Sequence, residues 1–94
     1  MLPWDPQKAI SNLSKHGISF DEAATVFRDP EGLDRHDDVH ADIEPRYQRL
    51  ATSVMGRVLL VVYTVRRSRS GHEEKRIISA RQASRKERAA YSRP

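Results

Sequence analysis

Three arginines in the two most apolar segments of the chain are candidates to bind a phosphate. Arg57 opens the run 57–65, whereas Arg76 and Arg81 belong to the run 75–81. At strand ends, side chains can leave the apolar layer and present forked guanidinium donors that match a phosphate. For any single arginine, an ion pair within the chain is about as common a role. Strict alternation places Arg76 and Arg81 on opposite sheet faces unless the strand bends between them.

Two further side chains could move a proton. A histidine side chain changes its charge near neutral pH, so His16 is a candidate to accept or release a proton. Its place before Gly17 also suits a purely structural role, in which a histidine interacts favourably with a helix C-terminus. Tyr63 could donate or accept through its phenol or stack on an unpaired base, although core packing is the simpler interpretation.

The charges of the chain divide sharply along its length. Residues 1–56 carry 6 Lys and Arg against 10 Asp and Glu, a net charge of −4. Residues 57–94 carry 11 against 3, a net charge of +8. Clustered Lys and Arg gain free energy from counterion release when they bind phosphates. The basic half therefore indicates a polyanionic partner, although a merely solubilising surface has the same composition.

Several classes of site and location are excluded or disfavoured. The chain has no cysteine, which removes disulfides and thiolate metal sites and fits a reducing, cytoplasmic compartment. Its apolar runs are too short to cross a bilayer, and we expect no membrane association. We expect no metal site, because the nearest candidates match no closed tetrahedral pattern. These candidates are His36, His40, Asp34, Asp37, Asp38 and Asp42.

Two short helices are predicted at the N-terminal end. An Asp-Pro pair starts a helix over residues 6–16, with apolar residues at helical spacing, and Gly17 provides its left-handed C-cap. Ser19 and Glu22 form the capping box of a second helix, which the Asp-Pro pair at 29–30 ends. These two helices precede every strong strand signal.

A last, basic helix is predicted at the C-terminal end. Ser84 and Glu87 have the spacing of a capping box, and we prefer this role for Glu87 over that of a general base. Arg85, Lys86 and Arg88 make the helix positively charged. Its few apolar residues predict weak packing on the rest of the molecule.

The strands are predicted between these helices. Residues 34–45 are polar, and we expect them to be mostly irregular, followed by a weak strand over 47–52. Runs 57–65 and 75–81 predict two strands of an antiparallel hairpin, of which the first is central because it is apolar on both faces. We expect residues 1–94 to form one α+β domain with a small antiparallel sheet of three or more strands.

The chain resembles the BrnT family of toxins nearly end to end. The first half carries Trp4-Asp5, Lys8, Asn12, Lys15-His16-Gly17, Phe20, Ala23-Ala24 and Asp29-Pro30. The second half carries Gly56-Arg57, Val61-Val62-Tyr63-Thr64, Arg66, Arg76-Ile77-Ile78-Ser79-Ala80-Arg81, Glu87-Arg88 and Tyr91. Two departures are Ala51, where a glycine is usual, and a longer hairpin over 66–75. The second departure flanks the basic strands, where it could change which RNA is admitted.

This resemblance implies a RelE-like fold and a ribonuclease that arrests translation. It implies an RNA substrate and an antitoxin, similar to BrnA, that carries a ribbon-helix-helix DNA-binding domain. A homodimer of the chain within the toxin-antitoxin complex is compatible with it. No cofactor is expected. The alternative is a non-catalytic module with a RelE-like fold that only binds nucleic acid or protein.

RNA cleavage without a metal uses the substrate's own 2′-hydroxyl as nucleophile. The enzyme must then supply a base, cations for the charged transition state and a proton for the leaving 5′-oxygen. We assign these catalytic tasks to Arg57, Arg76, Arg81, His16 and Tyr63. We assign RNA binding to Lys15, Arg66, Arg85, Lys86, Arg88 and Trp4. Core packing is the commoner role for a lone tryptophan such as Trp4.

Overall fold

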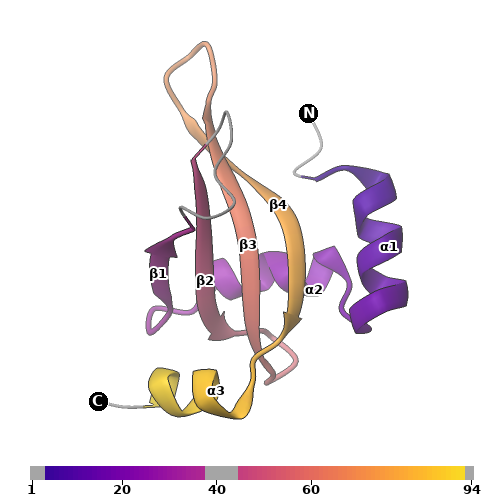
Figure 1. Cartoon of the computed structure of the whole chain (residues 1–94). Coiled ribbons are helices and arrows are strands. Elements are labelled where there is room, and N and C mark those ends of the chain that lie inside the picture. The colour runs from indigo at the N-terminus through magenta and orange to yellow at the C-terminus, as the bar shows by residue number, and fades with distance from the viewer. Residues whose placement is uncertain (1–3, 38–44, 93–94) are drawn as a thin grey trace.

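Four antiparallel strands and three helices make up the computed structural model of the chain, which describes residues 4–37 and 45–92 (Figure 1). The elements in chain order are α1 (Pro6–His16), α2 (Phe20–Ala24), the 3₁₀ turn η1 (Thr25–Arg28), β1 (Leu33–His36), β2 (Arg46–Thr52), β3 (Val58–Arg67), β4 (Glu73–Gln82) and α3 (Arg85–Ser92). The strands pair in the order β1-β2-β3-β4. This confirms the predicted α+β fold with two N-terminal helices, an antiparallel sheet and a C-terminal helix.

The N-terminal helices begin where their capping residues predict. The Asp5 side chain accepts a hydrogen bond from the Gln7 backbone N–H, and Gly17 ends α1 with φ of 71° in the left-handed region. Ser19 caps α2 by accepting from the Glu22 backbone N–H. The predicted second helix is α-helical only to Ala24 and continues as η1.

The core lies on one face of the sheet, which we call the covered face because α2 crosses behind it (Figure 1). Its buried members come from the segment around α2 and from the three longest strands. They are Ile18, Phe20, Ala23, Val26, Ala51, Leu59, Val61, Ile77 and Ala80. The other face, which we call the open face, has a smaller cluster under α3 that consists of Leu50, Leu60 and Ala83 with Val58 and Tyr91 packed against it.

The prediction that residues 34–45 are mostly irregular is wrong at the start of this segment, where β1 pairs with β2. Polar contacts hold β1 in place. Asp34 forms an ion pair with Arg49 and accepts a hydrogen bond from the Tyr63 hydroxyl at 2.7 Å. Because these polar bonds stabilise β1, the strand forms without the alternation of apolar and polar residues by which a strand is usually recognised in a sequence. Residues 38–44 lie outside the described part of the chain.

The two long strands β3 and β4 form the predicted antiparallel hairpin and extend beyond the predicted limits, to Arg67 and from Glu73. β3 is an interior strand, as its apolar character on both faces predicts. In the part of the chain that the structure describes, no helix has the length and apolar character needed to cross a bilayer.

Candidate nucleic-acid interface

A β-bulge in β4 decides which side chains reach the open face. The pairing of β3 with β4 shifts register between Val62 and Tyr63, because β4 contains one extra residue, Ile78. As a result, Ile77 and Ala80 both belong to the covered core, although they are three residues apart. Their neighbours on β4 are correspondingly directed to the open face.

The bulge places Arg76 and Arg81 on the same face. Arg76 is paired with Thr64, and Arg81 with Leu60. Directly paired residues share a face, and positions four apart on one strand share it too. The two arginines therefore both belong to the open face. The bulge interrupts the strict alternation that would otherwise place them on opposite faces.

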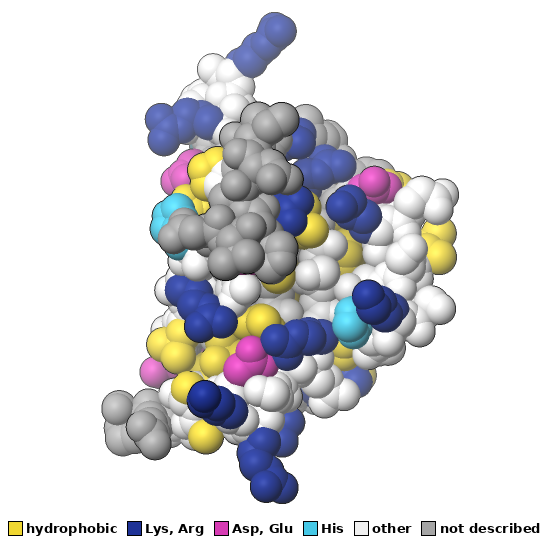
Figure 2. All heavy atoms as spheres, viewed as in Figure 1, with side chains coloured by type: hydrophobic (Ala, Val, Ile, Leu, Met, Phe, Trp, Pro, Cys, Tyr) yellow, Lys and Arg dark blue, Asp and Glu magenta, His cyan; other side chains and the backbone are white. Residues whose placement is uncertain are grey.

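A third arginine joins this face from β2. Arg46 is paired with Thr64 on the side opposite to Arg76, so the register places Thr64 between two guanidinium-bearing residues. Thr64 is buried, and its Oγ1 has no hydrogen-bond partner among the described residues, 4–37 and 45–92. Lys and Arg side chains recur along this face, from the β3–β4 hairpin to α3, with few carboxylates between them (Figure 2).

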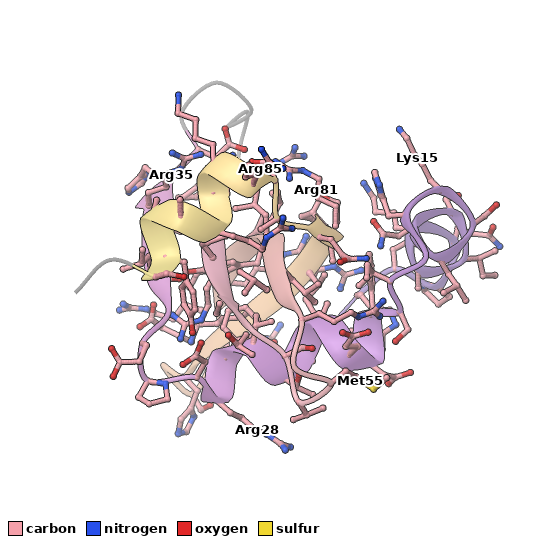
Figure 3. All side chains as sticks on the ribbon, turned by 90° about the horizontal axis from the view of Figure 1, so that it is seen from below. Lys15, Arg28, Arg35, Met55, Arg81 and Arg85 are labelled. Atoms are coloured by element: carbon pink, nitrogen blue, oxygen red, sulfur yellow. The ribbon has the colours of Figure 1, made fainter. Side chains whose placement is uncertain are left out.

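A groove between α1 and β4 continues the open face at the edge of the sheet. It has a volume of about 290 Å³ and brings the exposed side chains of Lys8, Lys15 and His16 beside Ser79. Labelled basic side chains from four elements lie along one side of the molecule in Figure 3: Lys15, Arg81, Arg85 and Arg35. The predicted residues Lys15 and His16 thus lie together, next to the strand that carries Arg76 and Arg81.

Asn12 positions the helix that forms this groove. Its side-chain amide donates to the carbonyl oxygens of Ile18 at 2.9 Å and Ala80 at 2.8 Å, and its Oδ1 accepts from the Ala80 N–H at 3.0 Å. The side chain is buried, so these bonds are shielded from water. Asn12 therefore fixes α1 against β4 two residues beyond the bulge.

Arg81 is held by a carboxylate of α3. Its two terminal nitrogens donate to Glu87 at 2.8 and 3.0 Å. Glu87 also accepts from the Ser84 N–H at 2.8 Å, while the Ser84 hydroxyl accepts from the Glu87 N–H, which confirms the predicted capping box. The hydrogen bonds from Arg81 are the largest cause of the fall in the pKa of Glu87 from 4.5 to about 2.

Stability is expected to fall in acid partly because Glu87 must then be protonated. A carboxyl with a depressed pKa stabilises the fold above its unfolded-state pKa, and this contribution is lost as the pH falls from about 4.5 to about 2. We expect Glu87→Gln to cost about 1–2 kcal/mol at pH 7, allowing for screening at the partly exposed Arg81, and much less at pH 2. Denaturant unfolding at both pH values measures this.

The control for this prediction is Glu73→Gln, which changes an exposed carboxylate at the start of β4. We expect its unfolding free energy to follow that of the wild type within about 0.5 kcal/mol. An equal loss in the two variants would show that the Arg81–Glu87 pair contributes nothing particular to stability.

Arg57 is not brought together with the other two predicted arginines. It forms an ion pair with the buried Glu22 of α2, with its Nε 3.0 Å from Oε2, and the Ser53 hydroxyl donates to the same carboxylate at 2.7 Å. The hydrogen bonds from Arg57 are the main reason why the pKa of Glu22 is lowered. Because α2 lies behind the covered face, Arg57 lies apart from Arg76 and Arg81.

Tyr63 is also directed away from the open face. It is buried, its ring lies edge-on to Phe27 with a centroid distance of 5.0 Å, and its hydroxyl donates to Asp34. Burial is the largest cause of the rise in the pKa of its phenol. Trp4, partly buried, packs edge-on against Phe20 at 5.8 Å. Both rings contribute to the covered core.

The predicted RNA-binding residues of the C-terminal half are exposed. Arg85 and Lys86 lie in the first turn of α3, and Arg88 donates to the carbonyl oxygen of Ala83 at 3.0 Å. Arg66 lies near the end of β3. Tyr91 is held by hydrogen bonds with Asp29 and Thr52, which attach the end of α3 to the rest of the fold.

The described residues contain no group of three or more metal-ligating side chains that could hold an ion. Of the candidates weighed from the sequence, His40, Asp38 and Asp42 lie outside those residues.

Comparison with known proteins finds a matching family. A family model described as "Ribonuclease toxin, BrnT, of type II toxin-antitoxin system" matches residues 4–87. A search of curated proteins found no significant match. The matched range includes every strand, the groove between α1 and β4, and the Arg81–Glu87 pair.

Proposed function

The chain belongs to the BrnT family of ribonuclease toxins of type II toxin-antitoxin systems, and on this premise we propose that RNA is held and cleaved on the open face and the adjoining groove. Family membership implies an RNA substrate and an antitoxin partner. The observation that carries the proposal is the bulge at Ile78, which directs Arg76 and Arg81 to the same face. Lys15 and His16 line the groove beside that face.

The proposed reaction is transesterification within the RNA. The substrate's 2′-oxygen attacks the adjacent phosphorus as its proton is removed, and the 5′-oxygen leaves with a proton, which yields a 2′,3′-cyclic phosphate. Arg76 and Arg81 stabilise the negative charge of the transition state, and Lys15 binds a neighbouring phosphate. His16 accepts the proton of the 2′-hydroxyl, and water supplies the proton that the leaving 5′-oxygen takes up. Arg57 is left out of this catalytic set because it bonds to Glu22 of α2, behind the covered face, whereas Arg81 belongs to the open face although Glu87 holds it.

Tyr63 is left out for a similar reason: its phenol is buried and bonded to Asp34. The exposed cations Arg66, Arg85, Lys86 and Arg88 extend the binding surface for phosphates. Cleavage by this surface would arrest translation. We further propose a ribbon-helix-helix antitoxin that neutralises the toxin by covering the open face, within a complex that contains two copies of the chain.

Metal-independent cleavage is the test of the proposed function. We expect the purified chain to cleave a defined single-stranded RNA in the presence of EDTA and to leave 2′,3′-cyclic phosphate ends, which end-group analysis or mass spectrometry identifies. The double variant Arg76→Ala/Arg81→Ala, purified identically, controls for contaminating ribonucleases. Wild-type protein that binds the RNA in a salt-sensitive manner yet leaves it intact would instead indicate a non-catalytic binding module.

A further inference from the structure

A small pocket lies between α3 and the open face, beside the Arg81–Glu87 pair. Its walls are mostly apolar and come from Leu33, Leu50, Leu60 and Ala90. Its volume is about 170 Å³, below the roughly 300–1,000 Å³ of sites for drug-sized ligands. Leu33 is 48% exposed in this wall, so a ligand in the pocket would bury apolar surface that now faces water. The dimensions suit a single planar ring system.

The polar rim of the pocket offers hydrogen-bond donors. The side-chain oxygen of Gln48 accepts from Arg35 Nε at 2.8 Å, which orients the amide and leaves its NH₂ group to donate. No described residue accepts a hydrogen bond from that NH₂ group. Two carboxylates in the lining already accept hydrogen bonds: Asp34 from Arg49 and from the Tyr63 hydroxyl, and Glu87 from Arg81 and from the Ser84 N–H. Arg35 adds further N–H donors and no acceptor.

We propose that this pocket binds one nucleobase of the RNA substrate, and that it prefers a base with carbonyl acceptors on its edge, guanine or uracil. The inference rests on the proposed function and extends it from phosphate binding to base selection. Apolar walls hold the faces of a base, and donors at the rim match its carbonyl oxygens.

The position of the pocket favours RNA as its occupant. Glu87 lines the pocket and binds Arg81, so the pocket adjoins the surface proposed to hold the cleaved phosphate. Arg35 and Arg85 lie on the same side of the molecule as Arg81 (Figure 3). A nucleotide whose phosphate contacts Arg81 can therefore place its base in the pocket under α3. This arrangement couples base identity to the site of cleavage.

Filling the pocket should abolish base selection without abolishing cleavage. Ala90 lines the pocket, whereas its neighbour Ala89 is exposed on the same helix and does not line it, so Ala90→Phe and Ala89→Phe form a matched pair. We expect wild type and Ala89→Phe to cleave a randomised single-stranded RNA with at least about tenfold preference for guanine or uracil at one position near the scissile bond. Ala90→Phe should reduce this preference to about threefold or less.

A second variant changes the chemistry of the rim. Gln48→Glu replaces the donating NH₂ group by an acceptor, so we expect the preference to move toward adenine or cytosine, whose edges carry amino donors. Methyl NMR of Leu33, Leu50, Leu60 and Ala90 during titration with a short RNA reports pocket occupancy independently of cleavage. We expect shifts at these methyls in wild type, and no RNA-induced shifts at the methyls of the three leucines in Ala90→Phe.

The outcomes separate this inference from the proposed function. Cleavage with no base preference, or equal preferences in the two phenylalanine variants, would overturn the pocket assignment and leave the nuclease in place. RNA-induced methyl shifts without any cleavage would support the base site and refute the nuclease. Methyl shifts that appear with the purified antitoxin but not with RNA would assign the pocket to protein binding and reject our proposal.

Discussion

Replacing Arg76 by alanine is expected to lower kcat/KM for RNA cleavage by about 10²-fold or more, because one preorganised donor to a transition-state oxyanion contributes about this much. Arg76 lies on the open face through its pairing with Thr64. The loss should fall mainly on kcat, since the charge on the phosphate oxygens grows as the reaction proceeds. Arg76→Lys should retain part of the rate, because an ammonium supplies charge without the forked geometry.

The matched control is Arg28→Ala, which removes the same charge from an exposed arginine on the opposite side of the molecule (Figure 3). We expect it to change kcat/KM by less than about threefold, through long-range attraction alone. Single-turnover kinetics with a defined RNA, at fixed ionic strength, separate the chemical step from binding. Equal losses in Arg76→Ala and Arg28→Ala would mean that net charge, and not the open face, determines the rate.

Asn12→Asp is expected to destabilise the fold by about 3–5 kcal/mol at pH 7, the usual cost of an uncompensated buried charge. The introduced carboxylate would face the carbonyl oxygens of Ile18 and Ala80, which now accept from the amide. For a domain of this size, such a loss lowers Tm by roughly 15–30 °C. Folding stabilities of small proteins total about 5–15 kcal/mol, so a large part of the molecule's stability is at stake.

Calorimetry or circular dichroism at pH 7 measures this effect, with Ser14→Asp as the control. Ser14 is exposed on α1, and we expect its replacement to change stability by no more than about 0.5 kcal/mol. The destabilisation by Asn12→Asp, taken relative to wild type, should shrink at pH 5, because burial favours the protonated form of the new carboxyl. A Tm within a few degrees of wild type would refute the fixing role of Asn12.

Local signals in the sequence predicted the helices and the long hairpin well. The capping residues Asp5, Ser19 and Ser84 interact only with nearby backbone, so their effect can be deduced from spacing alone. The two apolar strands were recognisable because burial on both faces leaves a continuous run of apolar residues. Glu87 was assigned correctly to the capping box for the same local reason.

Structural features that depend on residues distant in the sequence could not be deduced from such local signals. β1 forms through side chains that are far apart in sequence, such as Asp34 and Arg49. The pairing of Arg57 with Glu22 joins a strand start to a helix 35 positions away. Arg46 reaches the open face only because of the strand register. Lys8 was within reach of sequence reasoning, because its spacing from Lys15 places both on one helical face.

The extra residue in β4 makes the length of this strand a determinant of its chemistry. If the present sequence paired with β3 without a bulge, Ile78 would lie opposite Tyr63 and Ile77 opposite Thr64, so Arg76 would face the covered core and Ile77 would face water. A homologue that lacks Ile78 would instead keep the pairing of Arg76 with Thr64 by regular alternation. The shared face of the two arginines therefore depends on the number of residues between them together with the bulge that absorbs the odd one.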